Sequence, residues 1–433
     1  MRVLCLLVLL ATLFSFARTA KYCVDRFAPD FEYFYKGGAA LLQHGGLDPG
    51  YDVDPDGRIT PRGGIEWYLP FVSRILTLLA WAPPKVAGLL WLGLNLLATL
   101  ATMRLVGSYL VGLPRRDWPV TQLVPFILLA VFWYWEYRLN QINNFTLLLL
   151  TAAFVCWQRG KHYTAGFWLG LAVLLKVTPL LLVVWFLLKR QLRTVTAAVV
   201  TILVAGPLAT FAIYGQEYAT DCYRSWLHNA TIHGSQRGLI MAQTEMDWRN
   251  QGLGAVASRW LHPTNYALHF DNDPRLEAPD EYQTMNVLSW SRETIVWLVL
   301  TIQVLSLIGL IWLARHPARK LSPWQLRLEW GLFLLAMLWF MPVMRGYHLI
   351  WAYPALAILA GVLHHVGWRR RWSWLALACL LGMIVVQCAL RWTLPQAAGI
   401  LLWSVLGMAL PIALMLVQLK RDARAIPNDC INQ

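Results

Sequence analysis

An aspartate stands directly after the first apolar segment of the chain. Asp30 opens a stretch in which apolar or aromatic residues recur at Phe31, Phe34, Gly38 and Leu41. This spacing is typical of a helix that lies on a membrane surface. An acid at the start of such a helix faces the boundary between water and lipid, where a carboxylate serves as a general base. The alternative is that Asp30 acts only as the N-cap of the helix.

A lysine lies at the predicted turn of an apolar hairpin over residues 163–188. Lys176 is followed by Val177, Thr178 and Pro179, which interrupt the apolar run. A charge within the membrane is costly unless it is paired, and a lipid phosphate is a suitable partner. The alternative is an interfacial anchor whose ammonium group reaches water.

Two polar turns join predicted membrane spans on the outer side. Residues 135–144 carry many hydrogen-bonding groups and form either a binding rim or a polar turn in which Glu136 pairs with Arg138. The next such turn contains Arg345 and His348, and these residue types bind a phosphate or move a proton. The alternative for the histidine is an interfacial residue with satisfied hydrogen bonds.

An acidic segment in the first outer loop matches the first half of a calcium-binding loop. Asp52, Asp54 and Asp56 alternate along the chain and are followed by Gly57. The twelfth position of the pattern is Gly63, where a bidentate Glu is expected. A solvated acidic turn is therefore the alternative to a calcium site.

The elements that position these residues follow from composition. The chain has 433 residues, of which 58% are hydrophobic and only 14% charged, so successive apolar runs account for most of it. This predicts an all-α polytopic membrane protein. The net charge of +14 comes from Lys and Arg that lie in short clusters between apolar runs. Such clusters indicate membrane topology, and no nucleic-acid partner is expected.

Apolar runs near the length of a membrane span predict about twelve crossings, with two of them short. The basic clusters fall between alternate runs and are placed in the cytoplasm. Most acids fall in two outer loops with short surface helices, which we expect to hold the chemistry on the extracytoplasmic face of the plasma membrane. Cys23 and Cys222 lie in these loops and are candidates for a disulfide. The expected order within one domain is a first outer loop (21–84), a transmembrane core (85–214), a long outer loop (215–292), C-terminal helices (293–419) and a cytoplasmic tail (420–433).

Several of these stretches resemble motifs of glycosyltransferase family 87, the polyprenyl-phosphate-mannose-dependent mannosyltransferases of the GT-C class. The order and spacing of the motifs agree with the family along most of the chain, although Asn140 stands where Gly is usual and Gly252 where Ser is usual. The matching stretches are 30–40 (Asp-Phe-x-x-Tyr-Tyr-x-Ala-x-x-Ala), 68–70 (Tyr-Pro-Pro), 140–143 (Gly-Gln-x-Asn), 170–179 (Gly-x-Ala-x-x-x-Lys-x-x-Pro), 250–253 (Asn-Gln-Ser-Leu) and 347–348 (the end of a His box).

The resemblance implies a GT-C fold with its active site between the first outer loop and the membrane. Asp30 would take a proton from an acceptor hydroxyl as it attacks a sugar on polyprenyl phosphate, with inversion. Lys176, Arg345 and His348 would bind the donor phosphate. No cofactor is expected, and the acidic loop is the one candidate for a structural calcium ion. The turns and the resemblance together give these substrate-binding candidates: Glu32, Tyr33, Arg138, Asn140, Gln141, Asn143, Asn250 and Gln251.

The expected partners are a polyprenyl-phosphate sugar donor, a glycolipid or glycan acceptor, and membrane lipids. Two alternatives stay open. One is a GT-C enzyme that uses a different polyprenyl-linked sugar, and the other is a polytopic transporter or flippase for a lipid-linked sugar. A transporter predicts inverted repeats and broken helices at the centre of the bilayer, and the sequence shows no internal repeat.

Overall fold

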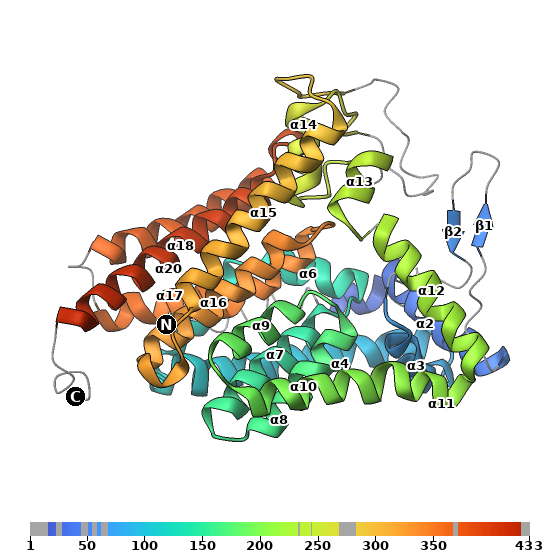
Figure 1. The fold of residues 1–433 in the computed structure, drawn as a ribbon, viewed down its shortest axis with the longest axis horizontal. Helices are drawn as coiled ribbons and strands as arrows, with labels where there is room; N and C mark the ends of the chain where they lie inside the picture. The colour runs from blue at the N-terminus through green and yellow to red at the C-terminus, as the bar shows by residue number, and fades with distance from the viewer. Residues whose placement is uncertain are drawn as a thin grey trace. The chain divides into compact units, whose positions relative to one another are not determined.

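The computed structural model describes residues 16–22, 28–44, 51–53, 59–61, 68–232, 234–243, 245–267, 283–366 and 371–425. Within these residues the chain is helical except for loops and one pair of short antiparallel strands, β1 (Tyr51–Val53) and β2 (Ile59–Pro61) (Figure 1). The predicted helical class is therefore confirmed, with a small hairpin that the sequence pattern did not indicate.

The chain divides into two compact units. The first comprises Met1–Leu105, Val131–Val183 and Leu192–Ala242, and the second comprises Val106–Ala130, Val184–Gln191 and Gln243–Gln433. Two helices cross this division, α6 (Ala130–Leu139) at its first residue and α9 (Leu180–Leu188) near its middle.

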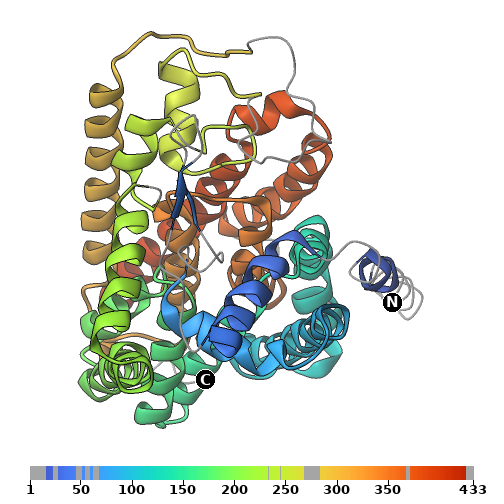
Figure 2. The same cartoon turned by 90° about the vertical axis from the view of Figure 1, so that its right-hand side faces the viewer.

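In the first unit, α8 packs against α7 and α10, and α4 packs against α7. The helices α2 and α3, drawn in blue in Figure 2, pack against each other. The elements are α2 (Pro29–His44), α3 (Pro70–Ala80), α4 (Pro84–Leu105), α7 (Asn143–Gln158), α8 (His162–Leu175), α10 (Leu192–Leu203), a π-helical segment (Val204–Leu208), α11 (Ala209–Tyr214), α12 (Gln216–Ile232) and α13 (Gln236–Ala242).

Two of these helix contacts depend on glycine. A Cβ atom on Gly38 of α2 would lie 2.7 Å from the carbonyl carbon of Leu76 in α3. A Cβ atom on Gly166 of α8 would lie 2.3 Å from the carbonyl oxygen of Thr194 in α10. Neither distance leaves room for a side chain, so the backbones approach closely only because glycine is present. The first contact holds the helix that carries Asp30, and the second holds the helix that ends just before Lys176.

In the second unit, α16 packs against α17 and α20, and α18 packs against α20. The elements are a π-helix (Val106–Val111), a 3₁₀ turn (Arg115–Asp117), a second π-helix (Pro119–Leu123), α5 (Val124–Ile127), α14 (Leu253–Leu261), α15 (Arg292–Ala314), a 3₁₀ turn (Ala318–Lys320), α16 (Pro323–Phe340), a 3₁₀ helix (Gly346–Ala352), α17 (Tyr353–Val366), α18 (Arg371–Ala389), α19 (Thr393–Ala397) and α20 (Ile400–Ala425).

Helix α16 has a well-defined start and carries a buried charge. Ser322 and Gln325 form a reciprocal capping box that satisfies two backbone donors at its first turn. Further along, Glu329 is 1% exposed and forms ion pairs with Lys189 and, at 2.8 Å, with Lys420. This buried triad therefore connects α16 to the residue that follows α9 and to α20.

Five helical segments in the described part are long and apolar enough to cross a membrane, namely Pro84–Val111, Leu192–Tyr214, Arg292–Ala314, Gly346–His364 and Ile400–Lys420. A sixth follows if Pro119–Ile127 and Ala130–Leu139, which meet at a bend of 61°, form one span. The chain is thus a multi-pass membrane protein by helix length and composition, and the number of about twelve crossings stays a prediction. The predicted helix break is confirmed, because α8 ends at Leu175 and α9 begins at Leu180.

Candidate active site

Asp30 lies in the first turn of α2. The helix begins at Pro29, and the amide of Glu32 donates to the carbonyl oxygen of Ala28 at 2.9 Å, so Ala28 takes the N-cap position. The interpretation of Asp30 as an N-cap is therefore wrong. A carboxylate in the first turn is stabilised by the positive end of the helix dipole. Its Oδ2 atom accepts a hydrogen bond from Nε2 of Gln141.

The turn that presents Gln141 is held in place by its neighbour Asn140. Asn140 has a φ angle of 56°, in the left-handed region that Asn tolerates better than most residues. Its side-chain amide donates to the carbonyl oxygen of Gly88 at 2.8 Å, and its own carbonyl oxygen accepts from Nε1 of Trp91 at 3.0 Å. Both partners belong to α4, so the turn is anchored to that helix. The left-handed φ explains why a glycine is usual at this position of the motif.

Gln141 connects Asp30 to Tyr68. The hydroxyl of Tyr68 donates to Oε1 of Gln141 at 3.4 Å, which leaves Nε2 to donate to Asp30. Burial, and then the nearby carboxylate of Asp30, raise the pKa of Tyr68, so the phenol keeps its proton. The ring of Phe34 packs edge-on against that of Tyr68, with 5.1 Å between the ring centres. Tyr68 therefore fixes the orientation of the Gln141 amide.

Lys176 belongs to the same constellation. The chain leaves α8 at this residue in an extended conformation, and Nζ donates to Oδ1 of Asn143 at 2.7 Å. The same nitrogen lies 5.9 Å from the centre of the Tyr68 ring. The carboxylates of Glu136 and Asp30 both attract the ammonium group. The structure thus brings together an acid, a cation and the amides between them.

Glu136 is a member of this site that the sequence did not single out as functional. Its side chain is fully buried, with Oε2 accepting from Nδ2 of Asn143 at 2.7 Å and Oε1 accepting from the backbone amide of Asn144 at 3.1 Å. The expected alternative, in which Glu136 pairs with Arg138, is wrong. Arg138 is exposed and lies over the ring of Tyr22, 5.1 Å from its centre. The sequence feature that could have indicated its role is an acid within an aromatic-rich helix, a few residues before Asn143 and Asn144.

Four further candidates belong to the first unit. Glu32 forms an ion pair with Lys36 at 2.7 Å in which both side chains are exposed. Arg138 faces outward as well, and Asn140 is completely buried and bonds to backbone. Tyr33 lies in α2, and its side chain is outside the described part of the structure. Substrate contacts by these four residues stay predictions.

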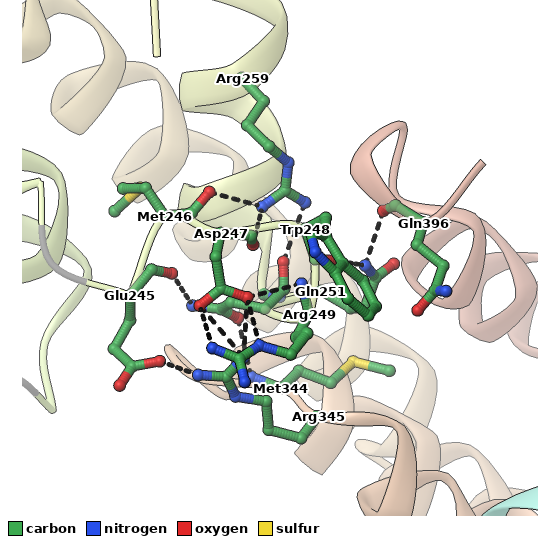
Figure 3. Close-up of polar contacts among 12 residues, drawn as sticks. Glu245, Met246, Asp247, Trp248, Arg249, Gln251, Arg259, Met344, Arg345 and Gln396 are labelled. Atoms are coloured by element: carbon green, nitrogen blue, oxygen red, sulfur yellow. Dashed lines mark hydrogen bonds and ion pairs between the residues drawn. The ribbon is translucent and has the colours of Figure 1, made fainter. Parts of the chain in front are cut away.

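Arg345 lies in the second unit within a cluster of ion pairs (Figure 3). Its guanidinium group contacts Glu245 and, at 3.0 Å, Oδ1 of Asp247, and Arg249 contacts the same oxygen at 3.0 Å. Burial alone would raise the pKa of Asp247, but the charges of Arg345 and Arg249 outweigh it and hold that pKa at about 2. Burial alone would lower the pKa of Arg345, whereas Asp247 and Glu245 raise it. Two carboxylates therefore already face the cation predicted to bind phosphate.

The loop that carries this cluster is fixed by buried polar side chains. The side chain of Asn250 accepts from the amides of Gly252 at 2.8 Å and Met344 at 3.0 Å. Gln251 donates to the carbonyl oxygen of Gln396 at 2.6 Å. Arg259, which is buried, donates to the carbonyl oxygens of Met246, Asp247, Asn250 and Ala397 at 2.7 to 3.2 Å.

These contacts support the loop rather than a ligand, and binding of substrate by Asn250 and Gln251 stays a prediction.

His348 is buried, and its Nδ1 accepts from the backbone amide of Arg345 at 3.0 Å. The proton of a neutral imidazole is then on Nε2. His348 therefore helps to set the backbone at Arg345, and its contact with a donor phosphate is untested.

Two predictions concern residues outside the described part of the chain. Asp54 and Asp56 of the acidic loop are among them, and Asp52 is described only as backbone in β1. Among the residues that the structure describes, no group of three or more His, Cys, Asp or Glu side chains is placed to hold a metal ion. Cys23 is also outside the described residues, while Cys222 is buried in α12. The calcium site and the disulfide stay predictions.

Comparison with known proteins gives one family and two relatives. The sequence model of glycosyltransferase family 87 matches residues 67–342. Two relatives bear the name polyprenol-phosphate-mannose-dependent alpha-(1-2)-phosphatidylinositol mannoside mannosyltransferase. The one from Mycobacterium tuberculosis is 26% identical over 352 residues, which cover 76% of this chain and 69% of the relative. The one from Mycolicibacterium smegmatis is 26% identical over 373 residues, which cover 80% and 71%. The matched range 67–342 includes Gln141 and Lys176, begins after Asp30 and ends before Arg345.

Proposed function

Because the chain belongs to glycosyltransferase family 87 and is thus a membrane glycosyltransferase, we propose that it moves mannose from polyprenyl phosphate to an acceptor hydroxyl. The names of both relatives support this donor, and the phosphatidylinositol mannoside in those names supports a glycolipid acceptor. The observation that carries the proposal is the link between Asp30 and Lys176 through the turn at Gln141 and Asn143. It provides one group that accepts a proton and one that receives an anion.

In the proposed reaction, Asp30 takes the proton of the acceptor hydroxyl. The acceptor oxygen attacks the anomeric carbon of mannose, and the bond from that carbon to the phosphate oxygen breaks. Attack from the side opposite to the leaving group inverts the configuration. Polyprenyl phosphate leaves as an anion with the electron pair of the broken bond, and Asp30 keeps the proton.

The protein's own residues supply what this step needs. Gln141 holds one oxygen of the Asp30 carboxylate through a hydrogen bond, and Tyr68 keeps the Gln141 amide oriented with its Nε2 toward Asp30. Lys176 provides a positive charge for the phosphate. The phosphate is a good leaving group as an anion, so no general acid is needed to protonate it. Arg345 and His348 are proposed as further donor contacts, although Arg345 is already compensated by Asp247 and Glu245.

The architecture we propose is the GT-C fold with about twelve crossings in the plasma membrane. The active site then lies on the extracytoplasmic face, where both lipid-linked donor and glycolipid acceptor reach it from the bilayer. The acidic outer loops and the basic clusters on the opposite connections support this orientation.

Asp30→Asn in membranes supplied with polyprenyl-phosphate mannose and a phosphatidylinositol mannoside acceptor tests the role of the base. We expect the transfer rate to fall by about 100-fold or more, since general-base catalysis contributes roughly that much. Asp221→Asn is the matched control, because Asp221 lies in a largely exposed ion pair of α12, and we expect it to keep the wild-type rate. Transfer by Asp30→Asn at close to the wild-type rate would show that another group accepts the proton.

A further inference from the structure

Glu136 is a buried acid that the proposed reaction does not use directly. It lies near the end of α6 with no exposed surface, and burying a carboxylate is costly unless hydrogen bonds satisfy its oxygens. Both oxygens are satisfied, one by the side chain of Asn143 and the other by the backbone amide of Asn144. The arrangement therefore fixes the first residues of α7 to the last turn of α6.

The Asn143 amide lies between two charges of opposite sign. Its Nδ2 donates to Oε2 of Glu136 at 2.7 Å, and its Oδ1 accepts from Nζ of Lys176 at 2.7 Å. An ionised carboxylate only accepts hydrogen bonds and an ammonium group only donates them. The amide is therefore held in a single orientation, because rotation by 180° would place donor against donor and acceptor against acceptor. Glu136 and Lys176 also attract each other across the amide.

We propose that Glu136 is a positioning residue, which uses the Asn143 amide to hold the Lys176 ammonium group where the phosphate of the lipid-linked donor binds. This inference rests on the proposed role of Lys176 and deepens it. Glu136 touches neither sugar nor phosphate. Its loss should therefore weaken the use of the donor, while the acceptor, which meets Asp30, should bind as before.

Glu136→Gln is the first test, because it preserves size and removes one acceptor. In the wild type the two donors bond to different oxygens of Glu136. The introduced Gln keeps an oxygen for one of them only, and if its NH₂ group faces Asn143 it favours a rotated Asn143 that turns a donor toward Lys176. We expect the KM for the donor to rise about tenfold, which is roughly 1.4 kcal/mol and within the net range of one hydrogen bond. The KM for the acceptor should stay unchanged. Glu217→Gln, exposed on α12, is the matched control.

The double variant Glu136→Gln with Asn143→Asp separates positioning from a general loss of stability. The carboxylate introduced at position 143 accepts from both Lys176 and the NH₂ group introduced at position 136, while the amide oxygen at position 136 still accepts from the Asn144 amide. Every hydrogen bond of this series is thus kept, with the carboxylate moved from one side chain to the other. We expect the donor KM to return to within about threefold of wild type, since the restored contacts are of the same kind. The thermal midpoint of each variant is measured alongside.

Two results would overturn the inference. One is a donor KM in Glu136→Gln equal to that of wild type. The other is an equal rise in the KM for donor and acceptor that the double variant does not reverse, which is the pattern of a merely structural residue. Binding of polyprenyl phosphate to the same variants in detergent provides a second readout. If the wild type transferred no mannose, the proposed function would fail, and this binding series would still decide the role of Glu136.

Discussion

Replacing Asp247 by Asn tests the ion-pair cluster of the second unit. Asn has nearly the same shape as Asp but lacks the charge that Arg345 and Arg249 each contact at 3.0 Å. The Asp247 side chain is 1% exposed, so water does not screen these contacts. The two guanidinium groups would then lie against a neutral amide, and among the carboxylates that the structure describes Glu245 alone would pair with Arg345.

The expected loss follows from the pKa of Asp247, which is lowered from an ordinary 3.8 to about 2. The difference between these values corresponds to about 2 kcal/mol of stability at pH 7. A carboxyl group with a lower pKa in the folded state contributes this fully above its unfolded pKa. The contribution is lost as the pH falls from about 4 to about 2. The amide of the Asp247→Asn variant does not titrate, so the two proteins should converge in stability at acid pH.

The assay is thermal unfolding in detergent at pH 7 and at steps down to about pH 2. For a chain of 433 residues, about 2 kcal/mol corresponds to a shift of about 2 °C. We expect Asp247→Asn to unfold lower than wild type by about that much at pH 7, with a difference that shrinks below about pH 4. Asp221→Asn is the control, because Asp221 meets Arg224 at 3.4 Å in a pair that is largely exposed. Such pairs are worth about 0 to 1 kcal/mol. Equal midpoints at pH 7, or a gap that persists in acid, would refute the reasoning.

Two other substitutions test the placement of the lysine proposed to bind phosphate. Lys176→Gln should raise the KM for the donor about 10- to 100-fold, because a hydrogen bond to a charged group is worth roughly 1.5 to 3 kcal/mol. The control Lys161→Gln, at the exposed start of α8, should leave the donor KM unchanged. An unchanged donor KM in Lys176→Gln would remove Lys176 from the phosphate site. Gly166→Ala places a Cβ atom 2.3 Å from the Thr194 carbonyl oxygen, so it should lower the free energy of unfolding by about 1 to 3 kcal/mol and lower the thermal midpoint. The control Gly309→Ala, with nothing within 4 Å of its Cβ atom, should not lower the midpoint. Equal midpoints for the two glycine variants would contradict the close contact of α8 with α10.

The acid, the amide turn and the lysine of the candidate site could be predicted from the sequence. Asp30 and Lys176 are charges at the ends of apolar runs, where an ionic group is costly without a partner. Such positions can be recognised from the sequence alone. Gln141 and Asn143 stand out as amides in a short turn between two such runs. The structure adds that Gln141 bonds to Asp30 and Asn143 to Lys176.

Partner choice could not be predicted in the same way. Arg138 is the nearest cation to Glu136 in the sequence, yet the left-handed turn at Asn140 brings Asn143 back to the carboxylate instead. Arg345 resembled a phosphate-binding residue because Asp247, its partner, lies far away along the chain. The sequence shows a charge but not the folded neighbour that compensates it. The pairing of β1 with β2 was missed because such short strands carry too few residues for a periodic pattern.

The buried triad of Glu329, Lys189 and Lys420 makes the last turns of α20 part of the packing of the second unit. Lys420 is one of two cations that balance a carboxylate inside the helix packing. Shortening the chain ahead of Lys420 would leave Glu329 with a single counter-charge, so deletions meant to trim the tail or to attach a fusion partner are safe only downstream of this residue. The last turns of α20 are thus required for the stability of the second unit and are not a dispensable extension.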